Sequence, residues 1–132
     1  MPTLLETASE LDKLLIAGWE AKTPIAIDNI PFTETLGQSY LSTQFIPYTT
    51  LDETIGCERK RTTGVYSITI RTPLESGIGL AYSYNEDIGV IMDNKCPLPN
   101  LFTLASETRR VGDTEDGWFS LICDIPFTSD NT

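Results

Sequence analysis

Residues 118–127 read WFSLICDIPF, and apolar side chains alternate along most of this stretch. Because successive side chains of a β-strand point to opposite faces, the alternating apolar ones share a single face. These residues are Phe119, Leu121, Cys123, Ile125 and Phe127. We therefore predict that this segment is the central strand of a sheet.

Four further segments predict the strands around it. Residues 65–72, VYSITIRT, alternate in the same way, with Tyr66, Ile68 and Ile70 facing inwards and Ser67, Thr69 and Arg71 outwards. Residues 38–47 predict a longer strand, and residues 101–111 predict a hairpin with 118–127 through an acidic turn. Prolines bracket the run PIAIDNIPF, so residues 24–29 predict a short edge strand or extended arm.

Two helices are predicted by apolar residues spaced three or four apart. The first starts at a capping box, Thr3 to Glu6, and Gly18 is its expected stop. Its apolar stripe is Leu4, Ala8, Leu11 and Leu15. The second helix follows a Ser76 cap and carries Ala81, Tyr84, Ile88 and Ile91. Gly79 and Gly89 weaken this second helix, and we expect them to allow close packing on the sheet.

The predicted fold class is α+β, with two helices packed on an antiparallel or mixed β-sheet. The predicted order of elements is α-β-β-β-α-β-β, and residues 1–132 form a single domain. Between Tyr48 and Thr63 the periodicity disappears, which predicts a long irregular loop. The dense basic cluster Arg59, Lys60 and Arg61 falls in this loop.

Composition excludes several classes of function. The chain has 19 acidic and nine basic residues, a net charge of −10, which disfavours binding to nucleic acids and to anionic membranes. Its three cysteines, Cys57, Cys96 and Cys123, cannot all pair within the chain, and free thiols in a reducing compartment are expected. We see no signal peptide and no apolar run long enough to span a membrane, so synthesis in the cytosol is expected.

The sequence offers little catalytic chemistry. It contains no histidine, which removes the commonest general base and metal ligand. The acidic pairs Glu86-Asp87 and Asp52-Glu53 lack an apolar setting that would raise a carboxyl pKa. The glycines of SGIGLA lack the rest of a dinucleotide fingerprint. We therefore predict no enzyme activity, no cofactor and no metal site.

A resemblance emerges when these motifs are taken in order. The segment PIAIDNIPF resembles the P-hydrophobic-x-hydrophobic-x-N-x-P-F pattern of small phage tail proteins. The strand GVYSITIRTP, the helix start SGIG and a late Gly-Trp follow it. Over residues 19–127, nearly the whole chain, the sequence is similar to the tail terminator (tail completion) family of long-tailed phages, of the minor tail protein U type.

The resemblance implies a structural virion protein without catalytic residues. Members of this family form a hexameric ring on the head-proximal end of the tail tube, stop its polymerisation and dock the neck. The implied partners are further copies of the chain, the tail tube protein and a neck or head-completion protein. DNA would pass through the ring without being specifically bound, and the protein would assemble in the host cytoplasm.

Specific residues are expected to serve these contacts. We expect the edge segment with Pro24, Ile25, Ile27 and Asn29 to help close the ring, since unpaired strand edges can pair with a neighbour. The loop at 48–63, with Arg59, Lys60 and Arg61, is expected to meet the tube or the neck. We expect an acidic lumen that repels DNA phosphates. The residues expected to form it are Asp52, Asp113, Glu115 and Asp116.

Three alternatives remain open from the residues. A head-side connector or tube-like protein would share the structural role and would form open filaments if it were a tube protein. A small acidic module that binds a basic protein or peptide would be a monomer with strongly salt-dependent affinity. Asp113, Glu115 and Asp116 could bind calcium, although a charged hairpin turn is the simpler interpretation.

Overall fold

Two long antiparallel strands run through the middle of the sheet. The computed structural model describes residues 4–20, 22–27, 38–52, 60–73, 78–99, 101–113 and 118–131. In it, β3 (Lys60–Pro73) and β6 (Trp118–Asn131) pair along their full lengths, and β2 (Tyr40–Asp52) pairs antiparallel with β3. The alternating segment 118–127 is thus a central strand, as its pattern predicts.

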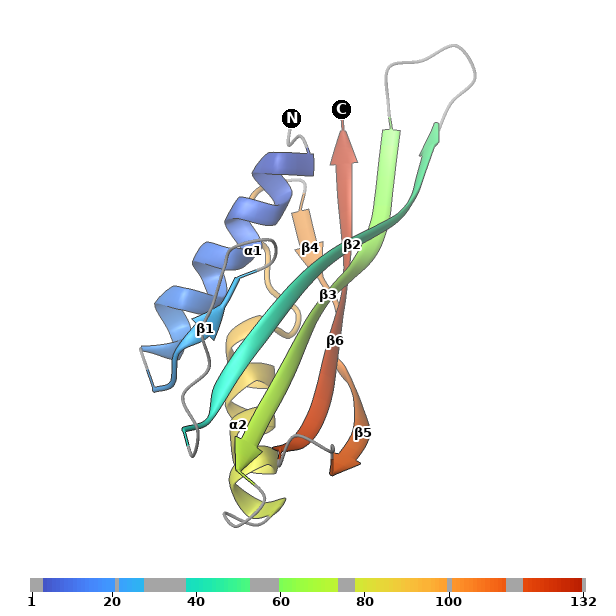
Figure 1. Cartoon of the computed structure of the whole chain (residues 1–132). Coiled ribbons are helices and arrows are strands. Elements are labelled where there is room, and N and C mark those ends of the chain that lie inside the picture. Colours follow the sequence, from blue (N-terminus) through green and yellow to red (C-terminus); the bar gives the residue numbers. More distant parts are fainter. Residues whose placement is uncertain are drawn as a thin grey trace.

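Shorter strands form the two sides of this sheet. On one side β1 (Ile25–Ala26) runs parallel to β2, so the sheet is mixed. On the other side β4 (Leu101–Thr103) and β5 (Glu107–Asp113) both pair antiparallel with β6, at successive positions along it. The predicted architecture of two helices on a mixed sheet is confirmed, as is the order of helices and strands (Figure 1).

The strand predicted at 101–111 is split in two. Three residues, 104–106, separate β4 from β5, while only two residues of β6 separate their partners Phe127 and Asp124. Pro126 lies in that interval of β6 and has no N–H to offer, although its carbonyl accepts from the N–H of Leu104 at 2.9 Å. Because the two segments differ in length and Pro126 lacks an N–H, the ladder of hydrogen bonds along this side of β6 is interrupted between β4 and β5.

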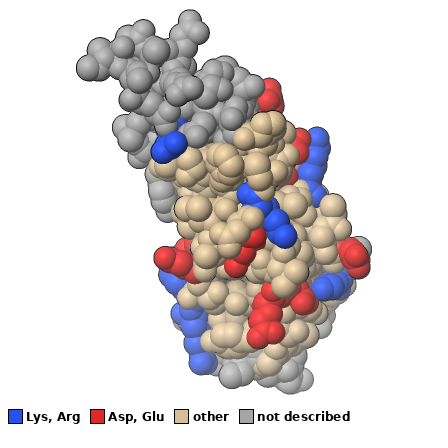
Figure 2. All heavy atoms as spheres, turned by 180° about the vertical axis from the view of Figure 1, so that it is seen from behind, with Lys and Arg blue, Asp and Glu red and all other residues tan. Residues whose placement is uncertain are grey.

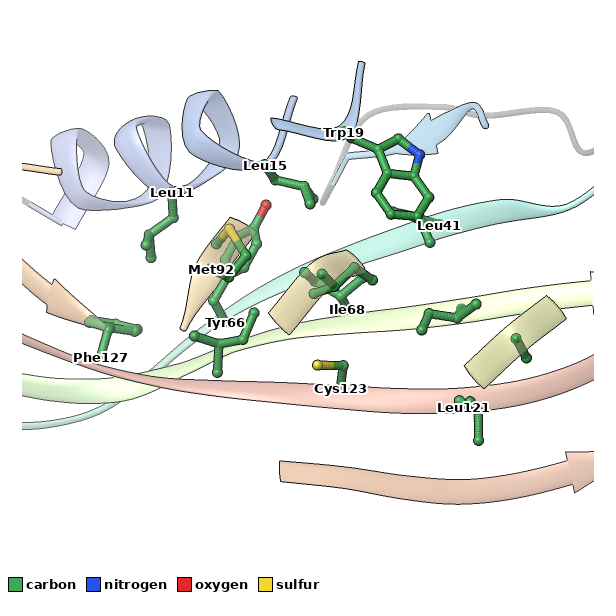
Figure 3. Close-up of a cluster of buried hydrophobic side chains, with 14 of the residues drawn as sticks. Leu11, Leu15, Trp19, Leu41, Tyr66, Ile68, Met92, Leu121, Cys123 and Phe127 are labelled. Carbon is green, nitrogen blue, oxygen red and sulfur yellow. The ribbon is translucent and has the colours of Figure 1, made fainter. Parts of the chain in front are cut away.

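Both helices cover the same face of the sheet. Figure 3 shows Leu11, Leu15 and Trp19 of α1 (Leu4–Trp19) pointing at Tyr66, Ile68 and other side chains of the strands, with Met92 of α2 (Ile78–Met92) between them. The predicted inward-facing residues of 65–72 and 118–127 are at most 3% exposed. The sequence predicts the burial of Leu11, Leu15, Tyr66 and Ile68 correctly, because both periodicities place the apolar side chains on one face. Trp19 and Met92 are buried as well, although neither belongs to a predicted stripe.

The role predicted for Gly18 is wrong. The helix α1 continues to Trp19, and the left-handed residue after it is Glu20, with φ of 56°. Gly18 instead lets α2 approach closely, since a Cβ there would lie 2.6 Å from Cγ2 of Ile91. The indole N–H of Trp19 donates to Oγ1 of Thr23 at 3.1 Å, which holds the chain as it leaves the helix.

The close packing expected at Gly79 and Gly89 is also wrong. A Cβ on Gly79 would meet nothing within 4 Å, and one on Gly89 would meet only Asp93 of the following turn. The close approach between the two helices therefore occurs at Gly18 of α1, where no pattern in the sequence marks it. The predicted cap, Ser76, lies outside the described residues.

The irregular segment expected at 48–63 is shorter than predicted. Strand β2 continues to Asp52 and β3 begins at Lys60, so that only 53–59 lies outside the described residues. The pairing register shifts between Pro47 and Thr49, and this irregularity breaks the alternation while the strand continues. In Figure 1 the ends of β2 and β3 extend beyond the two helices.

Candidate assembly surfaces

The segment around β1 lies at one edge of the sheet, as predicted. The N–H of Leu41 donates to the carbonyl of Pro24 at 3.0 Å, and Ile25 pairs with Leu41. Pro24, Ile25 and Ile27 are all partly buried. Among the described strands β1 pairs with β2 alone, which leaves its outer side for another contact. Asn29 lies outside the described residues.

Two of the predicted basic contact residues, Lys60 and Arg61, lie at the far end of the β2–β3 hairpin. Lys60 is the first residue of β3 and pairs with Asp52 of β2, and Arg61 is exposed between Leu51 and Asp130. Arg59 lies outside the described residues. This end of the sheet therefore carries at least one solvent-facing arginine.

The predicted acidic residues do not form one cluster. Asp52 stands at the hairpin end, whereas Asp113 ends β5 and pairs with Phe119 near the start of β6. Lys60, the partner of Asp52, pairs with Asn131, so nearly the full length of β6 separates the two aspartates. Glu115 and Asp116 lie outside the described residues. An acidic lumen built from these four residues stays a prediction.

Acidic side chains predominate on the two helices. Within their bounds α1 and α2 carry five acidic residues and a single basic one. They are Glu6, Glu10, Asp12, Glu86 and Asp87 against Lys13. Figure 2 views the molecule from behind and shows acidic side chains gathered in its lower part, among basic ones at the sides. Lys22, which follows α1, binds Asp87 at 3.0 Å.

The other face of the sheet, which no described helix covers, is termed the open face here. It is formed by alternate residues of the strands, among them Ser67, Thr69, Arg71, Ser120, Ile122 and Asp124. On this face Asp124 is bound by Arg109 of β5 at 3.1 Å. This face is poorer in acidic side chains than the helices are.

One row across the open face is unusual. Tyr40, Arg71 and Ser120 are consecutive partners across β2, β3 and β6. The guanidinium of Arg71 lies 5.9 Å from the ring centroid of Tyr40, and Trp118 packs edge-on against Tyr40 at 5.3 Å. Sequence alternation places Arg71 outwards, but only the strand register reveals its neighbours.

Two cysteines lie among the described residues, one exposed and one buried. Cys96 and Cys123 are free, and Cys57 lies outside the described residues. Burial raises the pKa of the Cys123 thiol to about 11, against an opposing hydrogen bond from Ser106. A thiol with so high a pKa is protonated at neutral pH and is a poor nucleophile.

The described part of the chain lacks two further features. No group of three or more His, Cys, Asp or Glu side chains is arranged there to hold a metal ion. No helix in it has both the length and the apolar character that crossing a membrane requires.

Comparison with solved structures shows that the fold is shared. One similar structure, which carries no functional description, has a TM-score of 0.70 at 17% identity, over 98% of this chain and 95% of that one. A chain from the virion of a native gene transfer agent (GTA) particle has a TM-score of 0.64 at 14% identity, over 94% of each chain. No curated protein sequence matches.

A family model supplies the assignment that the structures alone cannot give. The model described as phage tail terminator protein matches residues 7–89, more than half of the chain. The match includes β1, β2 and β3 and most of α1 and α2. The chain therefore belongs to the phage tail terminator protein family, a family of structural virion proteins.

Proposed function

We propose that this chain forms a ring at the head-proximal end of a phage tail tube, where it stops tube polymerisation and docks the neck. Membership of the tail terminator family is the observation that carries this proposal. The proposed partners are further copies of the chain, the tail tube protein and a neck or head-completion protein. We propose six copies in the ring.

The two sides of the sheet support an assembly of identical subunits. At one side β1 has no second partner among the described strands. At the other, all five residues of β5 with described side chains are exposed, Glu107 to Val111, and so are Phe102 and Leu104 beside it. Contacts between two different surfaces of one subunit generate closed rings when the rotation closes.

The whole chain is proposed to act as one domain. The hydroxyl groups of Thr7, in α1, and Ser129, in β6, approach to 3.5 Å across 122 residues of sequence. Tyr66 of β3 also donates a hydrogen bond from its hydroxyl to Asp12 of α1. These contacts tie the first helix to the central strands, which supports a single cooperative unit.

Charge supports the passage of DNA without binding. Six copies at −10 each would surround the channel with a strongly negative assembly, which disfavours phosphate contacts. We propose that the acidic residues Asp52, Asp113, Glu115 and Asp116 face the lumen and that the protein has no enzymatic role. The absence of histidine from the sequence and the protonated state of Cys123 support the second point.

Purified chain and the tail tube protein of the same phage provide the test. Electron microscopy of the chain alone is expected to show closed six-fold rings, and adding it to polymerising tube protein is expected to cap and shorten the tubes. Open filaments of the chain would indicate a tube-like protein instead. A monomer that binds basic peptides in low salt and leaves the tubes unaffected would indicate a binding module.

A further inference from the structure

One row of apolar side chains crosses the open face from β2 to β4, and it is termed the apolar row here. Its four members are Ile46, Val65, Pro126 and Leu104. Ile46 is the partner of Val65, and Val65 is the partner of Pro126. The N–H of Leu104 donates to the carbonyl of Pro126 at 2.9 Å, so Leu104 continues the row just beyond β4. Strand register thus makes neighbours of four residues that are distant in the sequence.

The apolar row lies between polar rows. The neighbouring rows contain Gln44, Ser67 and Asp124 on one side and Thr63 and Thr128 on the other. Polar residues are what an antiparallel sheet places on a face that meets solvent. Leu104 is nevertheless 49% exposed, and the other three members are partly exposed. An apolar surface with a polar border is typical of a contact with another protein.

The shape of the apolar row restricts what can cover it. The row is one residue deep along the strands, except at its β4 end, where Phe102 is 41% exposed on the same face. Across the strands it spans three strand spacings, about 14 Å. A second sheet would present an apolar face several residues deep and would bury the polar rows as well. A helix with a single apolar stripe matches a row of this length and depth.

Helix α1 carries such a stripe on its solvent side. Leu5 and Ile16 are 77% and 51% exposed, although both are large apolar residues. Their separation in the sequence is within about 20° of three full helical turns and extends about 16 Å along the helix axis. The exposed apolar residues of α2, Tyr82 and Val90, are about 80° apart around their helix and form no such line. The stripe of α1 therefore has nearly the length of the apolar row.

Charge allows α1 to approach the open face. By the strand register, β3, β5 and β6 place equal numbers of acidic and basic residues on this face. They are Arg61, Arg71 and Arg109 against Glu107, Asp124 and Asp130. The charged residues of α1 are Glu6, Glu10 and Asp12 against Lys13, so this helix is acidic. A face without net charge does not repel an acidic helix, and it offers no excess of cations to the phosphates of a nucleic acid.

We propose that the apolar row of one copy packs against Leu5 and Ile16 of α1 in a second copy of this chain. Both helices lie on the other side of the sheet from the open face (Figure 1), so each copy can use both surfaces at once. Such a contact joins two different surfaces and can repeat from copy to copy around a ring. This inference rests on the proposed ring and names one of its contacts.

A double variant, Val65→Thr with Leu104→Ser, tests the apolar row. Thermal melting close to that of wild type is expected, because threonine suits a strand as valine does and Leu104 is half exposed. The dissociation constant between subunits, measured by analytical ultracentrifugation, is expected to rise by about 10- to 100-fold, because two apolar side chains lose a favourable burial. An unchanged dissociation constant would overturn the proposal.

Val90→Thr is the matched control for this variant. It makes the same change from valine to threonine on α2, at a side chain that is 77% exposed and belongs to neither proposed surface. The control is expected to associate like wild type. A control that weakened association as much as the double variant would remove the evidence for a specific row and overturn the proposal.

Leu5→Ala with Ile16→Ala tests the stripe of α1. Alanine has the highest helix propensity, and both side chains are exposed in the single subunit, so α1 is expected to remain as stable as in wild type. The dissociation constant is again expected to rise by about 10- to 100-fold. Normal association of this variant would overturn the assignment to α1.

Mixing the two double variants shows whether the two surfaces bind each other. The row variant retains its α1 stripe and the α1 variant retains its apolar row, so a single intact contact can join one copy of each. At concentrations at which wild type forms rings, each variant alone is expected to be a monomer and the mixture to form dimers without rings. If the α1 variant alone formed dimers and mixing added nothing, the apolar row would pack against another apolar row, and the proposal would be overturned.

The tail tube protein is the other occupant that the experiment distinguishes. If both double variants form rings like wild type but no longer cap tail tubes, the apolar row meets the tube; the contact between copies is then overturned and the ring function stands. If wild type remains a monomer in solution and on tubes, the ring function and the contact are both overturned.

Discussion

At the scale of single residues, identical side chains have opposite roles in this protein. Thr103 is buried, and its Oγ1 accepts from the N–H of Lys95 at 2.7 Å and donates to the carbonyl of Met92 at 2.5 Å. It thereby satisfies the last turn of α2, after which Asn94 adopts a left-handed φ of 53°. Thr72 is fully buried too, yet its Oγ1 has no partner.

This contrast predicts opposite effects of one substitution. Thr72→Val is expected to raise the free energy of unfolding by about 1 kcal/mol, because it replaces a desolvated hydroxyl with a methyl group. Thr103→Val is expected to lower it by about 2 kcal/mol, because it leaves two backbone groups unsatisfied. Urea unfolding followed by circular dichroism measures both. A loss of stability in Thr72→Val would show that its hydroxyl has a partner in solution.

At the scale of elements, the packing of the two helices depends on a close approach between α1 and α2. Gly18 of α1 faces Ile91 of α2, and Trp19 packs edge-on against Tyr84 at 5.3 Å. The salt bridge between Lys22 and Asp87 lies on the surface of the same contact and contributes little. Steric fit, more than charge, therefore fixes how the helices pack.

Gly18→Ala and Gly79→Ala form a matched pair. Alanine at 79 meets open space, so the helix propensity of alanine is expected to stabilise the protein by roughly 0.5–1 kcal/mol. Alanine at 18 gains the same propensity but forces Ile91 to move, and a net loss of about 1–2 kcal/mol is expected. Thermal melting compares the two variants. Equal stabilisation of the two variants would mean that α2 moves to accommodate the new methyl group at position 18 without a loss of stability.

At the scale of the whole molecule, the far end of the long β2–β3 hairpin extends beyond the two helices (Figure 1). Its last described pair, Asp52 and Lys60, adjoins the residues of β6 that end the chain, and no described helix reaches it. This end is therefore a separate surface from the helix face.

Shortening the hairpin tests its proposed contact with the tube or the neck. Because Asp52 and Lys60 are direct partners, a two-residue Asn-Gly turn can replace residues 53–59. The free energy of unfolding is expected to change by less than about 1 kcal/mol, since a shorter loop alters closure entropy only slightly. Capping of tail tubes is expected to be lost in the electron microscopy assay.

A Gly/Ser replacement of 53–59 at the same length is the control for that experiment. If the side chains of the loop make the contact, this variant is also expected to lose the capping of tail tubes. A shortened variant that caps tubes like wild type would remove the hairpin tip from the list of contact surfaces.

Local periodicity was sufficient to predict the elements and their buried faces. The alternation in 65–72 and 118–127 and the helical spacing of Leu11 and Leu15 all follow from the geometry of one strand or one helix. The motif order was also sufficient to indicate the family. The errors occurred where a neighbour interrupts the period, as at Pro126 in the split strand and after Pro47 in the shifted one.

The sequence by itself thus determined the fold class, the core faces of β3, β6 and the first helix, and the family. Only the tertiary structure decided that Gly18 is a contact, that Asp52 and Asp113 lie far apart, and that Arg71 faces Ser120. The physical reason is that register and helix packing join residues distant in the chain. Periodicity shows which face a side chain is on, but it carries no information about what lies opposite.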